Sequence, residues 1–194
     1  MTSGAVFSPC RTWRYTLARI WHPGRPVMNV IGLNPSTADE TRDDPTIRRC
    51  IRFAMRDGYG GLVMTNIFAF RATDPADMKA AADPVGPDND RHLREQAERA
   101  ARVIAAWGAH GRHIGRGEAV AELLADLDLH CWRLTKDGHP AHPLYLPARL
   151  TPIQFGQAFP LREPLECKGS LGLWAPPDDV LERVKVDWLG QQEK

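Results

Sequence analysis

The amino-acid sequence predicts an α/β fold, in which helices cover both faces of a central, mostly parallel sheet of four strands. Two observations support this prediction. Short apolar runs alternate with helical segments along the chain, a pattern typical of β-α-β units and parallel strands. The run VMNVIGL at residues 27–33 is short and mostly apolar, as in a strand buried on both faces. We therefore expect a three-layer α/β/α domain over residues 1–150.

The strands follow in order. A β-prone, partly alternating segment at residues 13–21 is predicted as an early strand, and a Pro/Gly cluster at residues 22–26 ends it. The four core strands are predicted at residues 27–33, 61–68, 103–107 and 130–134.

The helix after the first core strand has clear ends. Asp44 can cap its N-terminus, Pro45 occupies the first helical position, and Gly58 follows its last turn. Apolar residues recur between these ends at helical spacing and form one face that can pack on the sheet. Two further helices are predicted, over about residues 88–102 and 118–127.

The composition changes beyond residue 150. Residues 151–177 are rich in proline and glycine, with scattered aromatic residues, and a short amphipathic helix is predicted at about residues 180–188. We interpret residues 151–194 as a C-terminal tail that wraps the domain, not as a second domain.

Overall composition excludes several classes of protein. Hydrophobic residues make up 43% of the chain, which is enough for a core without disulfides. The formal net charge of +1 gives no support for nucleic-acid binding, so any basic surface must be local. The four cysteines are far apart in sequence, which indicates reduced thiols. We see no signal peptide and no membrane span, and expect a monomeric, cytoplasmic protein.

Short polar motifs stand after the predicted core strands. The carboxyl ends of parallel strands converge on one crevice of an open sheet, so residues far apart in sequence would share one site. Two amides, a glycine turn and an imidazole are poor core-forming groups, but they suit a site that binds a nucleobase and breaks a bond. The motifs are Gly32-Leu33-Asn34-Pro35-Ser36, Thr65-Asn66, Trp107-Gly108 and His142-Pro143.

Each motif also has a plain structural explanation. Gly32 and Pro35 fit a strand-to-loop turn. Asn66 can simply bond a neighbouring loop, although a buried amide without partners costs about 1–3 kcal/mol. A histidine in a loop, such as His142, is usually just solvated. Arg71, close behind Asn66, could anchor a loop or a phosphate.

Other kinds of site find less support. The histidines could meet at a metal with Cys131, but no pair has helical H-x-x-x-H spacing, and we expect no metal site. The glycine- and histidine-rich segment 108–117 is interpreted as a loop. Signatures of phosphate-binding loops, dinucleotide sites and serine hydrolases are absent from the sequence. The arginines after Asp44 fit a solvated helix face. A few local phosphate contacts could still come from Arg42, Arg48 and Arg49, which flank the first motif.

Taken together, the motifs resemble those of the uracil-DNA glycosylase superfamily, in the same order along the chain. The G-x-N-P loop at Gly32 resembles the water-positioning loop of that superfamily, Asn66 its base-reading strand, and His142-Pro143 its leaving-group loop. Residues 10–150 resemble more closely a bacterial and phage family, the domain of unknown function 1643. Four segments carry that resemblance: Leu33 to Asp39, Asp44 to Cys50, Phe70 to Pro75, and Thr135 to Leu146.

The resemblance implies a glycosylase-like fold and a monofunctional DNA N-glycosidase, a hydrolase for a deaminated or modified pyrimidine, with no metal or organic cofactor. Asn34 and His142 would be catalytic. The sequence departs from the glycosylase pattern after Pro143, where Leu144-Tyr145 follows; either residue could be the apolar wedge that enters DNA. The implied substrate-binding residues are Gly32, Pro35, Ser36, Asn66, Phe68, Phe70, Arg71 and Gly108.

Two other functions remain open at this point. The same fold could serve as a non-catalytic module that binds nucleic acid or a nucleotide. It could also hydrolyse free nucleosides, which the near-neutral charge fits at least as well as it fits DNA binding.

Overall fold

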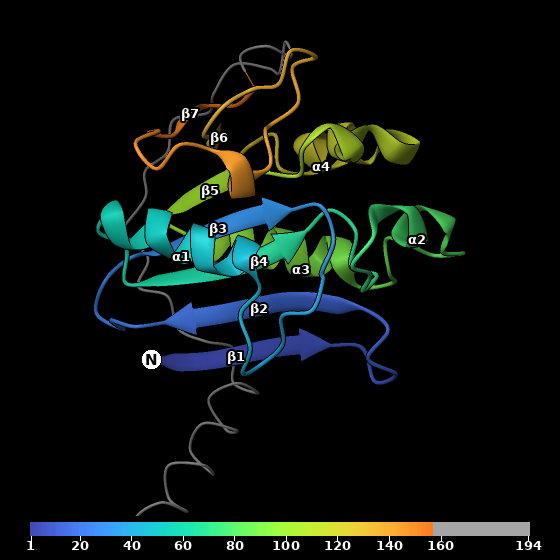
Figure 1. Ribbon diagram of the computed structural model, residues 1–194, viewed down its shortest axis with the longest axis horizontal. Coiled ribbons are helices and arrows are strands. Elements are labelled where there is room, and N and C mark those ends of the chain that lie inside the picture. The colour runs from blue at the N-terminus through green and yellow to red at the C-terminus, as the bar shows by residue number, and fades with distance from the viewer. Residues whose placement is uncertain (157–194) are drawn as a thin grey trace, which may run out of the picture.

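The protein is built around one mixed sheet of seven strands, with helices on both faces (Figure 1). The computed structural model describes residues 1–156, so the helix predicted in the tail lies outside the described residues. The strands are β1 (Thr2–Phe7), β2 (Arg14–Ile20), β3 (Val27–Gly32), β4 (Gly61–Asn66), β5 (Arg102–Ala105), β6 (Leu129–Cys131) and β7 (Ile153–Gln154). Their order across the sheet is β1-β2-β4-β3-β5-β6-β7.

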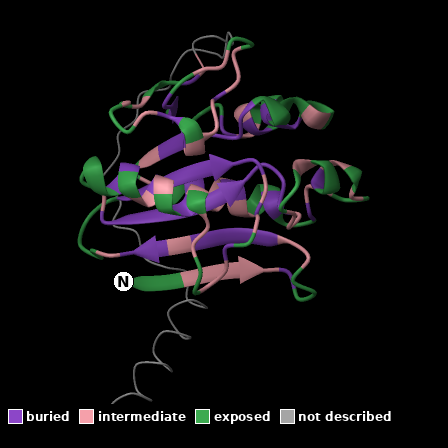
Figure 2. Cartoon of the chain, viewed as in Figure 1, coloured by how far each residue is buried: buried purple, intermediate pink, exposed green. Residues whose placement is uncertain are grey.

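The α/β class is confirmed, but the sheet differs from the expected one. The strands predicted as the core are parallel neighbours in the order β4-β3-β5-β6. Antiparallel pairing adds β2 and β1 on one side and β7 on the other, so the sheet is larger than four strands and mixed. β1 and β7 lacked a sequence signal because they are edge strands: β1 begins with exposed residues, and β7 has two exposed residues (Figure 2).

Helices connect the parallel strands. The α-helices are α1 (Pro45–Arg56), α2 (Pro75–Ala80), α3 (Asn89–Arg99) and α4 (Arg116–Leu123). Two short 3₁₀ helices, η1 (Ala109–Gly115) and η2 (Pro143–Tyr145), follow β5 and β6. The segment predicted as a loop at residues 108–117 is therefore largely helical, and α2 lies in a stretch for which only a polar segment was expected.

The ends of α1 agree with the prediction. The Asp44 side chain accepts a hydrogen bond from the Ile47 amide at 2.8 Å, and Pro45 begins the helix. Gly58 follows the helix with a φ of +83°, a conformation that favours glycine. These caps fix the point at which the loop after β3 turns back toward the sheet.

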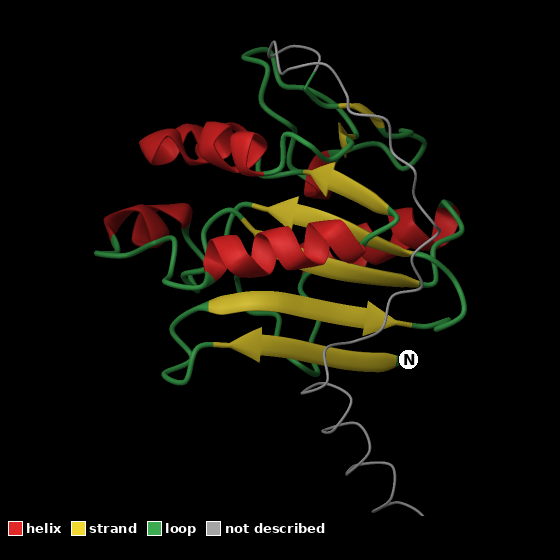
Figure 3. Cartoon of the chain, turned by 180° about the vertical axis from the view of Figure 1, so that it is seen from behind, coloured by secondary structure: helices red, strands yellow, loops and turns green. Residues whose placement is uncertain are grey.

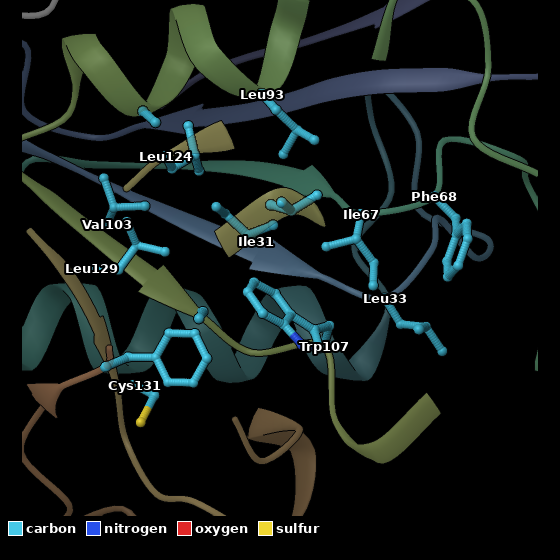
Figure 4. Close-up of a cluster of buried hydrophobic side chains, with 14 of the residues drawn as sticks. Ile31, Leu33, Ile67, Phe68, Leu93, Val103, Trp107, Leu124, Leu129 and Cys131 are labelled. Atoms are coloured by element: carbon cyan, nitrogen blue, oxygen red, sulfur yellow. The ribbon is translucent and has the colours of Figure 1, made fainter. Parts of the chain in front are cut away.

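The two faces of the sheet carry separate hydrophobic cores because neighbouring residues of a strand point to opposite faces. Val30 packs with α1 on one face, together with Phe53 and Trp132, whose stacked rings lie 4.4 Å apart. Ile31 packs on the other face with residues of α3 and α4 (Figure 4). Seen from behind, α3 crosses that second face (Figure 3). The layers are therefore helix, sheet and helix.

Candidate functional site

Three chain segments are joined at the carboxyl edge of the parallel strands. Residues 66–72 continue from β4 between the loop after β3 and the turn that precedes β2. Backbone hydrogen bonds of 2.9–3.1 Å hold them together: Ile67 to Gly32, Phe68 to Leu33, Ala72 to Pro35, Arg14 to Ala69, and Arg71 to Thr12. Three of the predicted motif residues therefore lie on backbone segments that are hydrogen-bonded to each other: Gly32, Asn34 and Asn66.

Asn66 ends β4 directly opposite Gly32 in the parallel register. Its side chain is 3% exposed, and its amide nitrogen Nδ2 has no hydrogen-bond partner among the described residues. A Cβ atom at Gly32 would lie 2.9 Å from the Asn66 Oδ1, closer than real contacts allow. Glycine at position 32 is therefore what leaves room for the Asn66 carboxamide.

Asn34 is half-buried at the start of the loop that leads to α1. Its Nδ2 donates to the carbonyl oxygens of Ala72 at 2.7 Å and Pro35 at 3.1 Å. The amide nitrogen thus holds the loop against residues 71–72, while Oδ1 makes no hydrogen bond within residues 1–156. Pro35 beside it is buried and Ser36 is half-buried.

Gly108 and His142 form the second pair that the structure brings together. Gly108 has a φ of +71° and donates its amide to the Pro140 carbonyl at 2.7 Å. A Cβ atom built on Gly108 would lie 3.4 Å from that of His142. The loop after β5 therefore packs closely against the loop after β6, at the position of the imidazole.

The His142 ring is held in its neutral form. Burial lowers its pKa below the ordinary value, and the Asp44 carboxylate opposes that shift only in part. Its Nδ1 accepts a long hydrogen bond of 3.4 Å from the Leu144 amide, which leaves the ring proton on Nε2. A buried neutral imidazole of this kind can donate one hydrogen bond to a ligand.

The two phenylalanines implied as substrate-binding, Phe68 and Phe70, have different surroundings. Phe68 is fully buried in the core shown in Figure 4, and its ring lies 5.7 Å from that of His113. Phe70 is half-buried and pairs with Trp13 through an isolated bridge. Tyr145, in the short helix η2 that follows His142, is 87% exposed, whereas Leu144 is half-buried.

The arginines after Asp44 mostly bind backbone. Arg49 donates to the Leu146 carbonyl, and Arg48 donates to the Asp43 carbonyl. Both side chains therefore fasten loops to α1, and a role in phosphate contact has no support from their geometry. Arg42, on the same loop, is exposed.

A further arginine, Arg14, lies at the carboxyl edge although the sequence did not mark it. Its side chain is 2% exposed, its Nη1 donates to the Ala38 carbonyl at 2.6 Å, and its Nε has no partner among the described residues. An available signal was an arginine between Trp13 and Tyr15 in a strand-like run. Burying such a cation without a carboxylate is costly, so its place at the edge suggests a role.

The described part of the chain offers no group of three potential metal ligands. The histidines have other neighbours: His110 contacts Lys79, with 3.0 Å between Nδ1 and Nζ, and His130 contacts Arg102. Within residues 1–156, no helix has both the length and the apolar character that crossing a bilayer requires.

Comparison with known proteins gives one match. The search found no similar curated protein and no similar solved structure. The model of a family described as a protein of unknown function, DUF1643, matches residues 14–144, from the start of β2 to the loop that carries His142. Because this match covers more than half of the chain, the protein belongs to the DUF1643 family.

Proposed function

We propose that the protein is a monofunctional N-glycosidase that hydrolyses the glycosidic bond of a deaminated or modified pyrimidine in DNA. One observation carries this proposal: the buried Asn66 amide ends β4 with an Nδ2 group that lacks a partner among the described residues. Nearly all buried amide groups are hydrogen-bonded, so an unpaired one at a strand end suits a ligand. A carboxamide offers a donor and an acceptor side by side, as the edge of a pyrimidine requires.

The base must leave the stack before its glycosidic bond can be reached. The unengaged Oδ1 of Asn34 is the atom that would hold the attacking water near C1′. Half-buried Phe70 is better placed than buried Phe68 to stack on the base. Nε2 of His142 would donate a hydrogen bond to the base oxygen as negative charge leaves with the base. One preorganised donor of this kind is typically worth about 2.7–4 kcal/mol, or roughly 10²–10³ in rate.

A second function is favoured by one specific contact. The Asn34 amide nitrogen donates to two loop carbonyls, which is what a purely structural asparagine does. If holding that loop is its whole role, the same edge of the sheet would be a non-catalytic module for binding a nucleic acid or a nucleotide through Asn66. The two proposals differ in whether replacing Asn34 removes turnover.

The test uses oligonucleotides that each carry one modified or deaminated pyrimidine. Release of the free base and binding of the oligonucleotide are measured for the wild type, Asn34→Ala and the control His139→Ala, which changes a half-buried histidine in the loop after β6. The wild type and the control should release a base. Asn34→Ala should be slower by about 10²–10³ while it binds within a few-fold of the wild type.

Three results would contradict catalysis on DNA. Folded wild type that releases no base from any oligonucleotide would exclude the glycosidase within that panel. Binding of the oligonucleotide by the wild type and by Asn34→Ala, without base release by either, would favour the binding module. Release from free nucleosides alone would favour a nucleoside hydrolase.

A further inference from the structure

Two arginines at the carboxyl edge of the sheet lack a carboxylate partner among the described residues. Arg14 is almost fully buried. The one hydrogen bond that its side chain makes to the described residues goes to the Ala38 carbonyl. Arg71 is half-buried, and its Nη1 donates to the Arg11 carbonyl at 3.3 Å. In both side chains, Nε is buried and has no partner within residues 1–156. Their positive charges therefore remain without a counter-ion in this part of the chain.

Other arginines beside them are paired. Arg19, also buried in β2, forms an ion pair with Asp43 at 2.8 Å and donates to three carbonyl oxygens. Arg11 forms a two-fold hydrogen-bonded ion pair with Glu40, at 3.0 and 3.1 Å. Arg19 and Arg11 thus have carboxylate partners. Arg14, Arg71 and, on α1, Arg49 instead combine a bond to a backbone carbonyl with an Nε that has no partner among the described residues.

The nearby carboxylates are engaged elsewhere. Asp39 and Asp44 act on Arg14 from a distance, since both raise its pKa, but neither is hydrogen-bonded to it. The Asp39 Oδ1 accepts hydrogen bonds from residues 41 and 42, and the Asp44 Oδ1 caps α1. Burial lowers the pKa of Arg14 to about 10 although these two carboxylates oppose the shift, so the guanidinium is still charged at neutral pH.

Arg14 and Arg71 lie on neighbouring backbone segments. Arg14 donates its backbone amide to Ala69 at 2.9 Å, and Arg71 donates its amide to Thr12 at 3.1 Å, so the two residues sit on paired segments. The charge of Arg71 also lowers the pKa of Arg14, so the two cations repel each other. An anion placed between the groups would remove this repulsion.

We propose that Arg14 and Arg71 form an anion subsite that binds a phosphate of the substrate, beside the Asn66 end of β4. Guanidinium groups match phosphate because they donate two parallel hydrogen bonds and carry a delocalised charge. The inference rests on the proposed function for the identity of the ligand, a nucleotide or a nucleic-acid strand and not a free nucleoside. The phosphate site itself does not depend on turnover.

Binding measurements at low salt test this inference without catalysis. The probes are inorganic phosphate, 2′-deoxyuridine, its 5′-monophosphate, and a short single-stranded oligodeoxynucleotide. The proteins are the full-length wild type, Arg71→Gln, Arg14→Gln and the control Arg52→Gln, which removes the same charge from an exposed position of α1. Isothermal titration gives each dissociation constant, and thermal melting reports whether each variant is folded.

The wild type should bind inorganic phosphate, and should bind the monophosphate more tightly than 2′-deoxyuridine. Arg71→Gln should weaken binding of the phosphate-bearing probes by about tenfold, the loss expected for one charge-assisted contact, with 2′-deoxyuridine unchanged. Arg52→Gln should bind like the wild type. Because Arg14 is buried, its variant counts only if it melts as a folded protein; Arg71→Gln alone decides the outcome if it does not.

Equal phosphate binding by the wild type and Arg71→Gln would overturn the subsite, as would equal affinity for the nucleoside and its monophosphate. Stronger binding of the oligodeoxynucleotide than of the monophosphate would assign the anion to a nucleic-acid backbone, and the reverse to a mononucleotide. Phosphate binding without base release would leave the subsite standing while the glycosidase fails. Base release by the wild type, together with unchanged phosphate binding by Arg71→Gln, would support the glycosidase and overturn the subsite.

Discussion

The two ends of β2 each carry a buried arginine that reaches the loop after β3, yet the two are held differently. Arg19 lies opposite the start of β4 and has a carboxylate and three carbonyls as partners. Arg14 lies beside the residues that follow β4, and its side chain donates to one carbonyl, that of Ala38. The same residue type thus serves the fold at one end of the strand and keeps free hydrogen-bonding capacity at the other.

The difference extends to the whole sheet. At the amino edge of the parallel strands, the Gly60 carbonyl accepts the amides of Trp21 and His22, and the Trp21 indole donates to Tyr59. At the carboxyl edge, Asn66 keeps an unpaired amide nitrogen and Arg71 an unpaired Nε among the described residues. Open α/β sheets bind ligands at their carboxyl edge, and Asn66 and Arg71 place unsatisfied polar groups there.

The largest expected effect compares the two arginines. Arg19→Met leaves Asp43 and buried carbonyls unpaired, so we expect it to lower the free energy of unfolding by about 3 kcal/mol or more. Arg14→Met removes a buried charge that lacks a carboxylate, and should cost less than about 1 kcal/mol. Denaturant titration of both variants measures the difference. Equal losses would mean that both arginines serve the fold.

A second comparison lies within the loop after β6. His142→Ala should slow base release by about 10²–10³, because the donor to the leaving base is lost. His139→Ala, three residues earlier, should leave the rate nearly unchanged. Single-turnover kinetics of both variants measure this. Turnover of His142→Ala equal to that of the wild type would remove the imidazole from the proposed chemistry.

A third comparison involves two asparagines that are in contact. The Asn89 Nδ2 donates to the carbonyls of Asn66 and Ile67, at 3.0 and 3.1 Å, so Asn89→Ala should cost about 2 kcal/mol of stability. Asn66→Ala removes an amide nitrogen without a described partner, and should cost less than Asn89→Ala while it abolishes discrimination between bases. Denaturant titration and binding assays measure the two effects. A larger stability loss from Asn66→Ala would indicate that Asn66 is structural.

The pH dependence of stability gives a smaller effect. Burial lowers the pKa of His142 in the folded protein below its ordinary value of 6.5. The stabilisation gained by keeping this ring neutral is therefore fully present above pH 6.5, and is lost as the pH falls through the lowered pKa. Unfolding free energies of the wild type and His142→Ala, measured above and below pH 6.5, should converge at the lower pH. A constant difference would contradict burial of the neutral ring.

The smallest effect concerns the thiols. Cys10, in the turn between β1 and β2, is exposed, and hydrogen bonds from Ser8 and Thr12 lower its pKa to about 7. Burial raises the pKa of Cys50 and Cys131. Alkylation should therefore show a fast phase with a midpoint near pH 7 that Cys10→Ser removes. A fast phase that survives in Cys10→Ser would place the reactive thiol elsewhere.

Local signals in the sequence were sufficient for the centre of the fold. The caps Asp44 and Pro45 located α1, and mostly apolar runs located β3 and β4, because capping and burial depend on nearby residues. The edge strand β1 was missed because pairing with one neighbour requires no apolar pattern. The short helix α2 lies among proline and aspartate residues that are equally common in loops.

The candidate site was predictable only in part. Strand-end position marked Asn66, which ends β4 at the carboxyl edge of the parallel strands. His142 was marked by its place in the loop after β6. Arg14 was not predicted, because its proposed role depends on the lack of a carboxylate partner among the described residues. Residues distant in sequence determine whether such a partner is present. The commitment of the Asn34 nitrogen to the Ala72 carbonyl, 38 residues away, likewise follows from tertiary structure alone.

The central claim is that the carboxyl edge of this sheet binds a pyrimidine base and releases it. The most direct measurement is the yield of free base from the modified-pyrimidine oligonucleotides, determined in parallel for the wild type and Asn66→Ala. We expect release from at least one oligonucleotide by the wild type, and none above background by folded Asn66→Ala. Release at the same rate by both proteins would contradict the claim, as would no release by the folded wild type.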